Sequence, residues 1–184
     1  MLSMDDRLPR QATADDLRAL AHPLSWRILR LCLDSAWTNQ QLAKRLEESP
    51  ATVLRRVHAL AEAGFLVAEP ARRSDLGAWE RPYRTTRRTW HLDLDQAGDP
   101  ALTARVELAT LDAHRAEMLE ADPASIQQTR RGVVRLSDEA AAELQSRLDA
   151  LLDEFVAREE PAGRRHSFLW SVVERPGEPD TAED

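Results

Sequence analysis

The sequence has few cysteines, few glycines and no long apolar run, and each shortage excludes a class of protein. A single cysteine, Cys32, rules out an internal disulfide framework and is typical of a reducing cytoplasm. No uninterrupted apolar segment is long enough to cross a bilayer. Residues 1–10 contain two aspartates and no apolar run, so they lack the features of a signal peptide. We therefore expect a cytoplasmic chain without membrane contact.

Signatures of enzymes are equally scarce. The glycines form no phosphate-binding loop, and the sequence contains neither a nucleophile elbow nor a His-Glu-x-x-His motif. The histidines, at positions 22, 58, 91, 114 and 166, share no recognisable spacing. We therefore expect neither enzymatic activity nor a cofactor.

The charge of the chain is unevenly distributed. The net charge of −7 would by itself disfavour a nucleic-acid partner. However, residues 1–95 contain 15 basic and 13 acidic side chains, whereas residues 96–184 contain 10 and 19. Residues 72–88 alone contain six arginines against two acids. The N-terminal half therefore has a concentrated positive segment, and the C-terminal half provides the excess acid.

Residues 38–64 predict two short helices joined by a tight turn. Thr38 is suited to cap the first helix, with Gln41 completing a capping box. Ser49 is suited to cap the second helix, Pro50 to occupy its first position, and Gly64 to end it. Such a helix pair is typical of helix-turn-helix proteins, whose second helix enters the DNA major groove.

The second helix of the pair has an apolar side and a cationic side. Val53, Val57 and Leu60 recur at helical spacing, and Arg55 lies nearly opposite them. A charged face also occurs on any solvated surface helix, so this pattern alone leaves DNA binding open. The candidate DNA-contacting residues of this helix and its cap are Ser49, Ala51, Thr52, Arg55 and Arg56.

The segment after this helix predicts two strands around a cationic loop. Residues 65–67 and 83–94 are rich in β-branched and aromatic residues, whereas residues 71–80 are polar and contain glycine. Strands of this kind directly after a helix-turn-helix form a wing, whose arginines reach neighbouring phosphates or the minor groove. The alternative is a solvated hairpin. The candidate DNA contacts of the wing are Arg72, Arg73, Arg81 and Arg84.

Residues 15 to about 92 resemble the winged helix-turn-helix of the arsenic-repressor (ArsR-like) superfamily of bacterial transcription regulators. The resemblance lies in LRALAHPLSWRILRL at 17–31, TNQQLAKRLEESPATVLRRVHALAEAGFLV at 38–67, and RPYRTTRRTWHL at 81–92. It implies a homodimer that binds double-stranded DNA at an inverted-repeat operator, usually as a repressor. It also implies that terminal helices form the dimer.

The same resemblance raises the question of metal sensing. Relatives that bind metal through a Cys-x-Cys pair would have it where this chain has Ala36, Trp37 and Thr38. A second family site uses Asp-x-His followed by further ligands, of which this chain offers only Asp112, His114 and Glu117. Because a tetrahedral site requires four donors, these three are weak candidates and we expect no metal.

The C-terminal half predicts two further elements. Residues 101–121 form a helical pattern that is apolar on two sides, which favours a dimerisation helix. Residues 130–136 and 166–174 predict strands that flank a helix capped by Ser137. This strand-helix-strand unit is too small to be stable alone, so it either encloses an effector pocket with Trp90, Phe168 and Trp170 or enlarges the dimer interface.

The sequence as a whole therefore predicts an α+β, mainly helical chain. A winged helix-turn-helix domain occupies 13–95, and a region for dimerisation and possible small-molecule effector binding occupies 100–175. Residues 1–12 and 176–184 are expected to be flexible termini. The rival prediction is a winged-helix protein-interaction module that does not bind specific DNA, with the acidic C-terminal half as its working surface.

Overall fold

The computed structural model describes residues 10–73, 77–94, 98–160 and 162–174, except for the side chains of Trp90 and His91. The chain divides into two compact units, Met1–Asp122 and Pro123–Asp184, which are described separately. The architecture is mainly helical with short strands, as the sequence predicts. Among the described residues, no helix is both long and apolar enough to span a bilayer.

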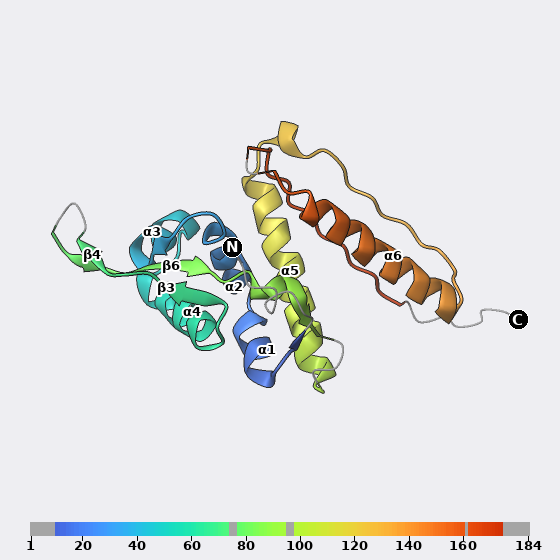
Figure 1. The fold of residues 1–184 in the computed structure, drawn as a ribbon, viewed down its shortest axis with the longest axis horizontal. Coiled ribbons are helices and arrows are strands. Elements are labelled where there is room, and N and C mark those ends of the chain that lie inside the picture. Colours follow the sequence, from blue (N-terminus) through green and yellow to red (C-terminus); the bar gives the residue numbers. More distant parts are fainter. Residues whose placement is uncertain (1–9, 74–76, 95–97, 161, 175–184) are drawn as a thin grey trace, which may run out of the picture. The chain divides into compact units, whose positions relative to one another are not determined.

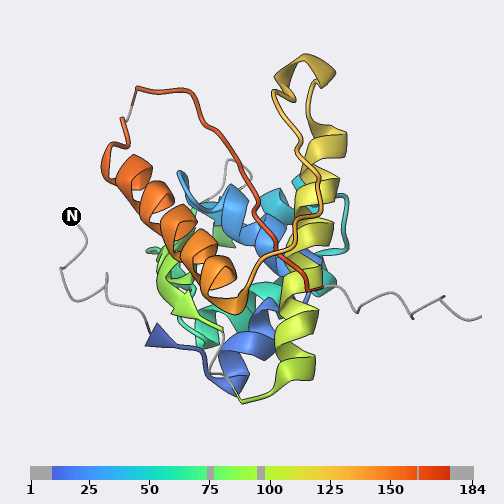
Figure 2. The same cartoon turned by 90° about the vertical axis from the view of Figure 1, so that its right-hand side faces the viewer.

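The described part of the first unit is built around five helices (Figure 1). Figure 2 shows α5 rising beside the blue helices α1 and α2. The unit thus includes the long helix that was predicted to belong to the C-terminal region. The helices are α1 (Ala14–Leu20), α2 (Pro23–Leu31), α3 (Asn39–Leu46), α4 (Pro50–Glu62) and α5 (Pro100–Glu120).

Local signals place the helix starts where the sequence predicts them. Thr38 accepts a hydrogen bond from the Gln41 backbone while the Gln41 side chain accepts one from Thr38, which completes the capping box of α3. The Ser49 side chain caps α4, and Pro50 occupies its first turn. At its end, Gly64 has φ +76°, a conformation that glycine adopts without strain.

One contiguous apolar core holds the helices of the first unit together. Phe65 is fully buried between the end of α4 and the strands, and Val106 of α5 is equally buried. Cys32 is also fully buried, and burial raises the pKa of its thiol to about 12. Cys32 is therefore a small apolar side chain of this core.

The described strands form three small sheets. β2 (Trp37–Thr38) and β3 (Leu66–Ala68) both pair antiparallel with the central β6 (Pro82–Thr85). β4 (Arg72–Arg73) and β5 (Trp79–Glu80) form the hairpin that we call the wing hairpin. The third sheet is a parallel pair of β1 (Arg10–Gln11) and β7 (Leu92–Asp93).

The prediction of one continuous strand over residues 83–94 was wrong in part. β6 ends at Thr85, and the 3-10 helix η2 (Arg88–His91) separates it from β7. Arg87 adopts a left-handed conformation with φ 61°, and its backbone donates to the Thr85 hydroxyl at 3.2 Å. The Thr86 hydroxyl donates to the Gly64 carbonyl at 2.8 Å, in addition to the bond of the Thr86 backbone to the Phe65 carbonyl at 3.0 Å, and the strand does not continue beyond this point.

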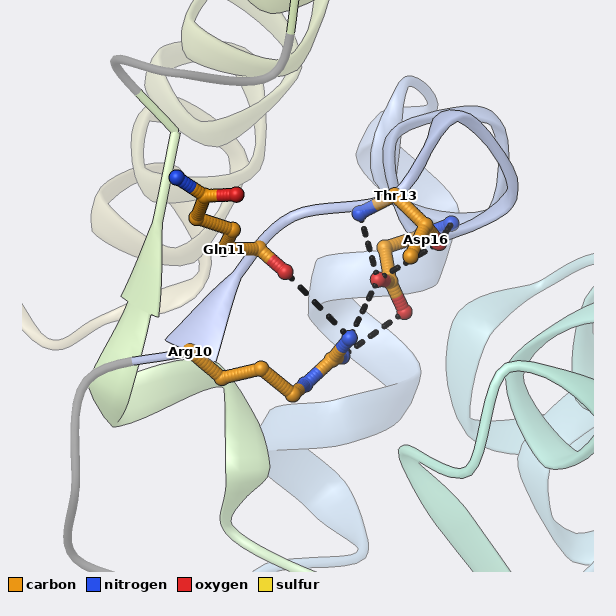
Figure 3. A network of polar contacts seen from close by, with 4 residues as sticks. All are labelled: Arg10, Gln11, Thr13 and Asp16. Carbon is orange, nitrogen blue, oxygen red and sulfur yellow. Dashed lines mark hydrogen bonds and ion pairs between the residues drawn. The ribbon is translucent and has the colours of Figure 1, made fainter.

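The predicted flexible arm 1–12 was wrong for its last three residues. Arg10 donates two hydrogen bonds to Asp16, at 2.8 and 2.9 Å, as Figure 3 shows. The same carboxylate accepts from the Thr13 backbone at 2.8 Å and from its hydroxyl at 2.7 Å. With β1 pairing and a buried Ala12, these contacts fix the segment against the first unit. The predicted flexible residues 1–9 and 176–184 lie outside the described part of the chain.

Replacing Asp16 by asparagine is expected to destabilise the first unit by about 1–3 kcal/mol near neutral pH. Burial raises the pKa of Asp16, but the bonds from Arg10 and Thr13 outweigh it, so the pKa lies below its ordinary value of 3.8. A carboxyl group whose pKa is lowered by folding stabilises the folded state at any pH above its ordinary pKa. This stabilisation is lost as the pH falls through the pKa that the group has in the folded protein. Urea unfolding from neutral to acidic pH measures both effects.

Asp15→Asn is the matched control, because Asp15 lies beside Asp16 but is exposed and paired only with exposed Arg18. Its effect is expected to stay within about 0.5 kcal/mol. Equal destabilisation by the two variants, or a difference that persists undiminished in acid, would show that the buried network does not stabilise the unit.

The described part of the second unit contains one long helix, α6 (Asp138–Ala157), and the short 3-10 helix η3 (Pro123–Ser125). Ser137 caps α6 as predicted. The predicted strands at 130–136 and 166–174 were wrong, because neither segment forms a ladder among the described residues (Figures 1 and 2). Val133 is 80% exposed and Val173 is 75% exposed. An apolar, β-branched composition favours a strand only where a neighbouring strand accepts its hydrogen bonds.

Candidate nucleic-acid interface

The turn between α3 and α4 is fixed by short-range contacts. Glu47 ends α3 in a left-handed conformation with φ 56°, and the Glu48 backbone donates to the Ala43 carbonyl at 3.0 Å. Asn39, at the start of α3, donates from its side chain to the Pro50 carbonyl at 3.1 Å. The first turns of the two helices are therefore tied together, which fixes the orientation of α4 relative to α3.

α4 turns its apolar side into the core and a mixed side to solvent. Val53, Val57 and Leu60 are fully buried, as their spacing predicts. Ala51, Arg55 and His58 are exposed on the opposite side. Sequence reasoning missed Leu54, which is 38% exposed beside Arg55 and offers an apolar contact. The exposed side therefore provides one cation with apolar and small neighbours.

Arg56 differs from Arg55 in its surroundings. It is half-buried, and its Nε is a buried donor that has no hydrogen-bond partner among the described residues. Burial, followed by the charge of Arg55, lowers the pKa of Arg56 from its usual value. The two adjacent arginines thus have separate environments, and only Arg55 extends freely from the exposed side of α4.

His22 is close enough to this arginine pair to be influenced by its charge, and it was not singled out by sequence reasoning. Its Nδ1 accepts a hydrogen bond from the Leu24 backbone at 3.1 Å and so caps α2. Burial, then the charges of Arg56 and Arg55, lower the pKa of His22, although Glu48 opposes them. The cap requires an unprotonated Nδ1, and these surroundings favour that form.

The hydroxyl groups at the start of α4 are used locally. The Ser49 hydroxyl accepts from the Thr52 backbone at 3.1 Å and donates to the Thr52 hydroxyl at 2.9 Å. Ser49 is exposed, and Thr52 is half-buried. Both residues therefore serve the helix cap, and their exposed oxygen atoms lie at the N-terminal end of α4, where an approaching phosphate is also favoured.

The four predicted wing arginines lie in different surroundings. Arg84 on β6 donates to Glu69 at 2.7 Å and to the Asp34 carbonyl at 3.0 Å, so its guanidinium links parts of the fold. Arg72 donates to Glu80 across the wing hairpin at 2.9 Å. Arg81 is exposed. The remaining one, Arg73, lies over the ring of Trp79, 5.6 Å from its centroid. Arg73 and Arg81 are consequently the more available cations.

The three weak metal candidates do not assemble a site. Asp112 is exposed, whereas Glu117 pairs with Arg30 at 2.6 Å. Asp112 and His114, two residues apart on α5, diverge by about 200° around the helix. Burial raises the pKa of Glu117, although Arg30 and then His114 oppose this effect. Among the described residues, no group of three or more His, Cys, Asp or Glu side chains is placed to hold a metal ion.

The last turn of α5 is linked by ion pairs to the helix-turn-helix, a connection that sequence reasoning missed. Glu120 pairs with Arg27 of α2 and, at 3.0 Å, with Arg45 of α3. The Glu117–Arg30 pair lies in the same turn. These ion pairs could not be predicted from helical spacing, because the paired residues are far apart in the sequence.

The residues of the predicted effector pocket are divided between the two units, so neither unit contains the full set. Phe168 and Trp170, both in the second unit, are 52% and 53% exposed. The Trp90 side chain belongs to the first unit and lies outside the described part of the structure.

Comparison with known proteins identifies the helix pair. A family model described as the IclR helix-turn-helix domain matches residues 33–70, which include α3 and α4. The chain carries a winged helix-turn-helix domain. Domains of this type occur in DNA-binding transcriptional regulators. The matched family differs from the ArsR-like superfamily that the sequence resembles, and the match covers well under half of the chain. No curated protein sequence matches the chain.

Several solved structures are weakly similar to the chain. Reduced HlyU from Vibrio cholerae N16961 is 20% identical, covering 55% of this chain and 84% of HlyU, with a TM-score of 0.34. An apo ZitR mutant from Lactococcus lactis is 18% identical, covering 73% of this chain and 83% of ZitR, with a TM-score of 0.32. The adhesin competence repressor AdcR from Streptococcus pyogenes is 16% identical, covering 72% of this chain and 80% of AdcR, with a TM-score of 0.30.

Proposed function

We propose that the chain is a homodimeric transcriptional regulator that inserts α4 into the DNA major groove at an inverted-repeat operator. The observation that carries this proposal is the exposed Arg55, presented on a helix whose opposite side is locked into the core. An α-helix fits the major groove, and an arginine pairs bidentately with guanine there. The helix-turn-helix match over 33–70 supports the same function.

The proposed contacts divide into base reading and phosphate binding. Arg55 reads a base, and Ala51 allows close approach of the helix to the groove floor. Ser49 and Thr52, at the N-terminal end of α4, and the half-buried Arg56 bind the phosphate backbone. The wing adds phosphate contacts. Exposed Arg81 and Arg73, which lies over Trp79, are the more available cations, whereas Arg72 and Arg84 already pair with Glu80 and Glu69.

We assign dimerisation to the exposed side of α5. One side of α5 is buried in the first unit through Leu102, Val106, Ala109 and Ala113. On the other side, Leu108 is 60% exposed, Leu111 38% and Leu119 72%. Packing this second apolar stripe against the same stripe of another copy removes it from water and sets the separation of two α4 helices. The resemblance to the ArsR-like superfamily supports three parts of the proposal. These are dimerisation through α5, membership of that superfamily, and a role as a repressor.

The test is a salt titration of the full chain against its own upstream DNA and against a random duplex of equal length. We expect a clear preference for the upstream DNA, a steep decrease in affinity with salt, and two chains for each bound duplex. Fluorescence anisotropy gives the affinity, and sedimentation velocity gives the stoichiometry. Absence of binding to either duplex at low salt would refute DNA binding, and one chain for each duplex would refute the dimer.

A second function is favoured by a specific observation in the second unit. Among its described residues none is buried, and Val133, Phe168, Trp170 and Val173 are all at least half exposed. An apolar surface of this kind marks a protein-interaction site. If removal of residues 130–175 abolishes binding to a partner protein, and the intact chain binds no DNA at any salt, the protein is an interaction module.

A further inference from the structure

Trp79 is the exposed aromatic residue of the wing hairpin. Its side chain is 70% exposed, although an indole is among the largest apolar groups in proteins. The hairpin that carries it projects beyond the helices of the first unit (Figure 1). From the sequence alone, this loop is only a source of arginines. Leaving such a side chain in water is unfavourable unless a partner covers it.

The indole is held in place by its neighbours on the hairpin. Arg73 is the cross-strand partner of Trp79, and its guanidinium lies over the ring at 5.6 Å. The next pair along the ladder, Arg72 and Glu80, is joined by an ion pair at 2.9 Å. The Arg73 contact restricts the ring before any partner arrives, and the Arg72–Glu80 pair joins the two strands that carry it, which lowers the entropic cost of binding.

The charges around the indole select the kind of partner. Arg72 and Arg73 lie on the adjacent strand, exposed Arg81 follows β5, and the nearby Glu80 is already paired with Arg72. An aromatic ring with one guanidinium over it, and exposed Arg81 two residues further along the chain, suits a partner that offers both flat apolar rings and negative charge. Nucleic acids offer both, as bases and sugars beside phosphates.

We propose that Trp79 is a DNA-binding residue that inserts its indole into the minor groove next to the half-site contacted by α4, while Arg73 neutralises the adjacent phosphate. This inference rests on the proposed DNA-binding function. Apolar side chains that enter the minor groove act as wedges between base steps, and pyrimidine–purine steps open most easily. Trp79 thereby favours flexible A·T-rich sequence beside the operator and gives specificity through DNA deformability.

The experiment compares the full-length wild type with Trp79→Ala, Trp79→Phe, Arg73→Ala and the matched control Phe155→Ala. Phe155 is another exposed aromatic residue, at 60%, and an arginine, Arg158, also lies over its ring, but Phe155 belongs to α6. The probes are alternating A·T and alternating G·C duplexes of equal length, titrated by fluorescence anisotropy at several salt concentrations. Circular dichroism and sedimentation velocity of each variant without DNA check its fold and oligomeric state.

We expect Trp79→Ala to weaken binding to the alternating A·T duplex on the order of tenfold, with little change in salt dependence because no charge is lost. The loss on the G·C duplex is expected to be smaller. Trp79→Phe should retain most of the affinity, Arg73→Ala should reduce the salt slope by about one, and Phe155→Ala should bind as the wild type does.

The other outcomes distinguish this inference from the proposed function. If the wild type binds both duplexes and folded Trp79→Ala binds them equally well, Trp79 is not a DNA contact, although the proposed function stands. If Trp79→Ala changes the oligomeric state without changing DNA affinity, the indole is a protein contact. If the wild type binds no duplex even at low salt, the inference and the proposed function fail together.

Discussion

Phe65→Ala is expected to destabilise the first unit by about 3–5 kcal/mol. Phe65 is fully buried at the junction of α4 and the sheet. Its backbone donates to the Leu60 carbonyl at 2.8 Å and accepts from the Thr86 backbone at 3.0 Å. Alanine removes the ring and leaves a cavity that these fixed backbone contacts prevent from closing. Urea unfolding followed by circular dichroism measures the loss.

Leu54→Ala is the matched control for this prediction, because Leu54 lies on the exposed side of the same helix. Its effect on unfolding is expected to stay within about 0.5 kcal/mol. Folded Phe65→Ala should still bind DNA at low temperature, since the substituted ring does not face the proposed interface. A loss of stability below about 1 kcal/mol would show that the junction of α4 and the sheet is not part of the core.

Arg55→Ala is expected to weaken binding to the operator by about 1–3 kcal/mol and to relax specificity at one base pair. The reason is that Arg55 is exposed on α4, whereas the neighbouring Arg56 is half-buried with its Nε facing protein. A lysine at position 55 keeps the charge but loses the bidentate fork, so Arg55→Lys should recover non-specific affinity without recovering specificity. Anisotropy titrations on the operator and on single-base variants measure both effects.

Arg147→Ala provides a matched loss of charge on α6 of the second unit, which contributes no residue to the proposed interface, and should leave affinity unchanged. The stability of Arg55→Ala should equal that of the wild type, because Arg55 is exposed. If Arg55→Ala loses equal affinity for the operator and for random DNA, Arg55 is a phosphate contact. If neither affinity changes, α4 does not enter the groove as proposed.

Features that depend on a few neighbouring residues could be predicted from the sequence. The capping box of Thr38 and the N-caps of Ser49 and Ser137 were confirmed, because a cap is formed by atoms within one helical turn. The buried side of α4 was confirmed for the same reason, since helical periodicity assigns Val53 and Val57 to one face.

Strand predictions were less successful, because a strand needs a partner that is distant in the sequence. β6 receives its partners from β2 and β3, whereas residues 130–136 and 166–174 receive none among the described residues. All these segments were predicted as strands from the same kind of composition, so composition alone did not distinguish the segment that pairs from those that do not. Arg10–Gln11 shows the converse, because a polar segment without a strand pattern became β1 by pairing with β7.

The sequence by itself determined the helix pair α3 and α4, the caps of α3, α4 and α6, the buried side of α4 and the concentration of arginines after it. Only the tertiary structure decided what those arginines do. Arg84 and Arg72 are held by Glu69 and Glu80, whereas Arg73 lies against an exposed Trp79 and Arg55 extends from α4. The physical reason is that a guanidinium group binds whichever carboxylate or ring the folded backbone brings within reach, and residue spacing along the chain does not specify that partner.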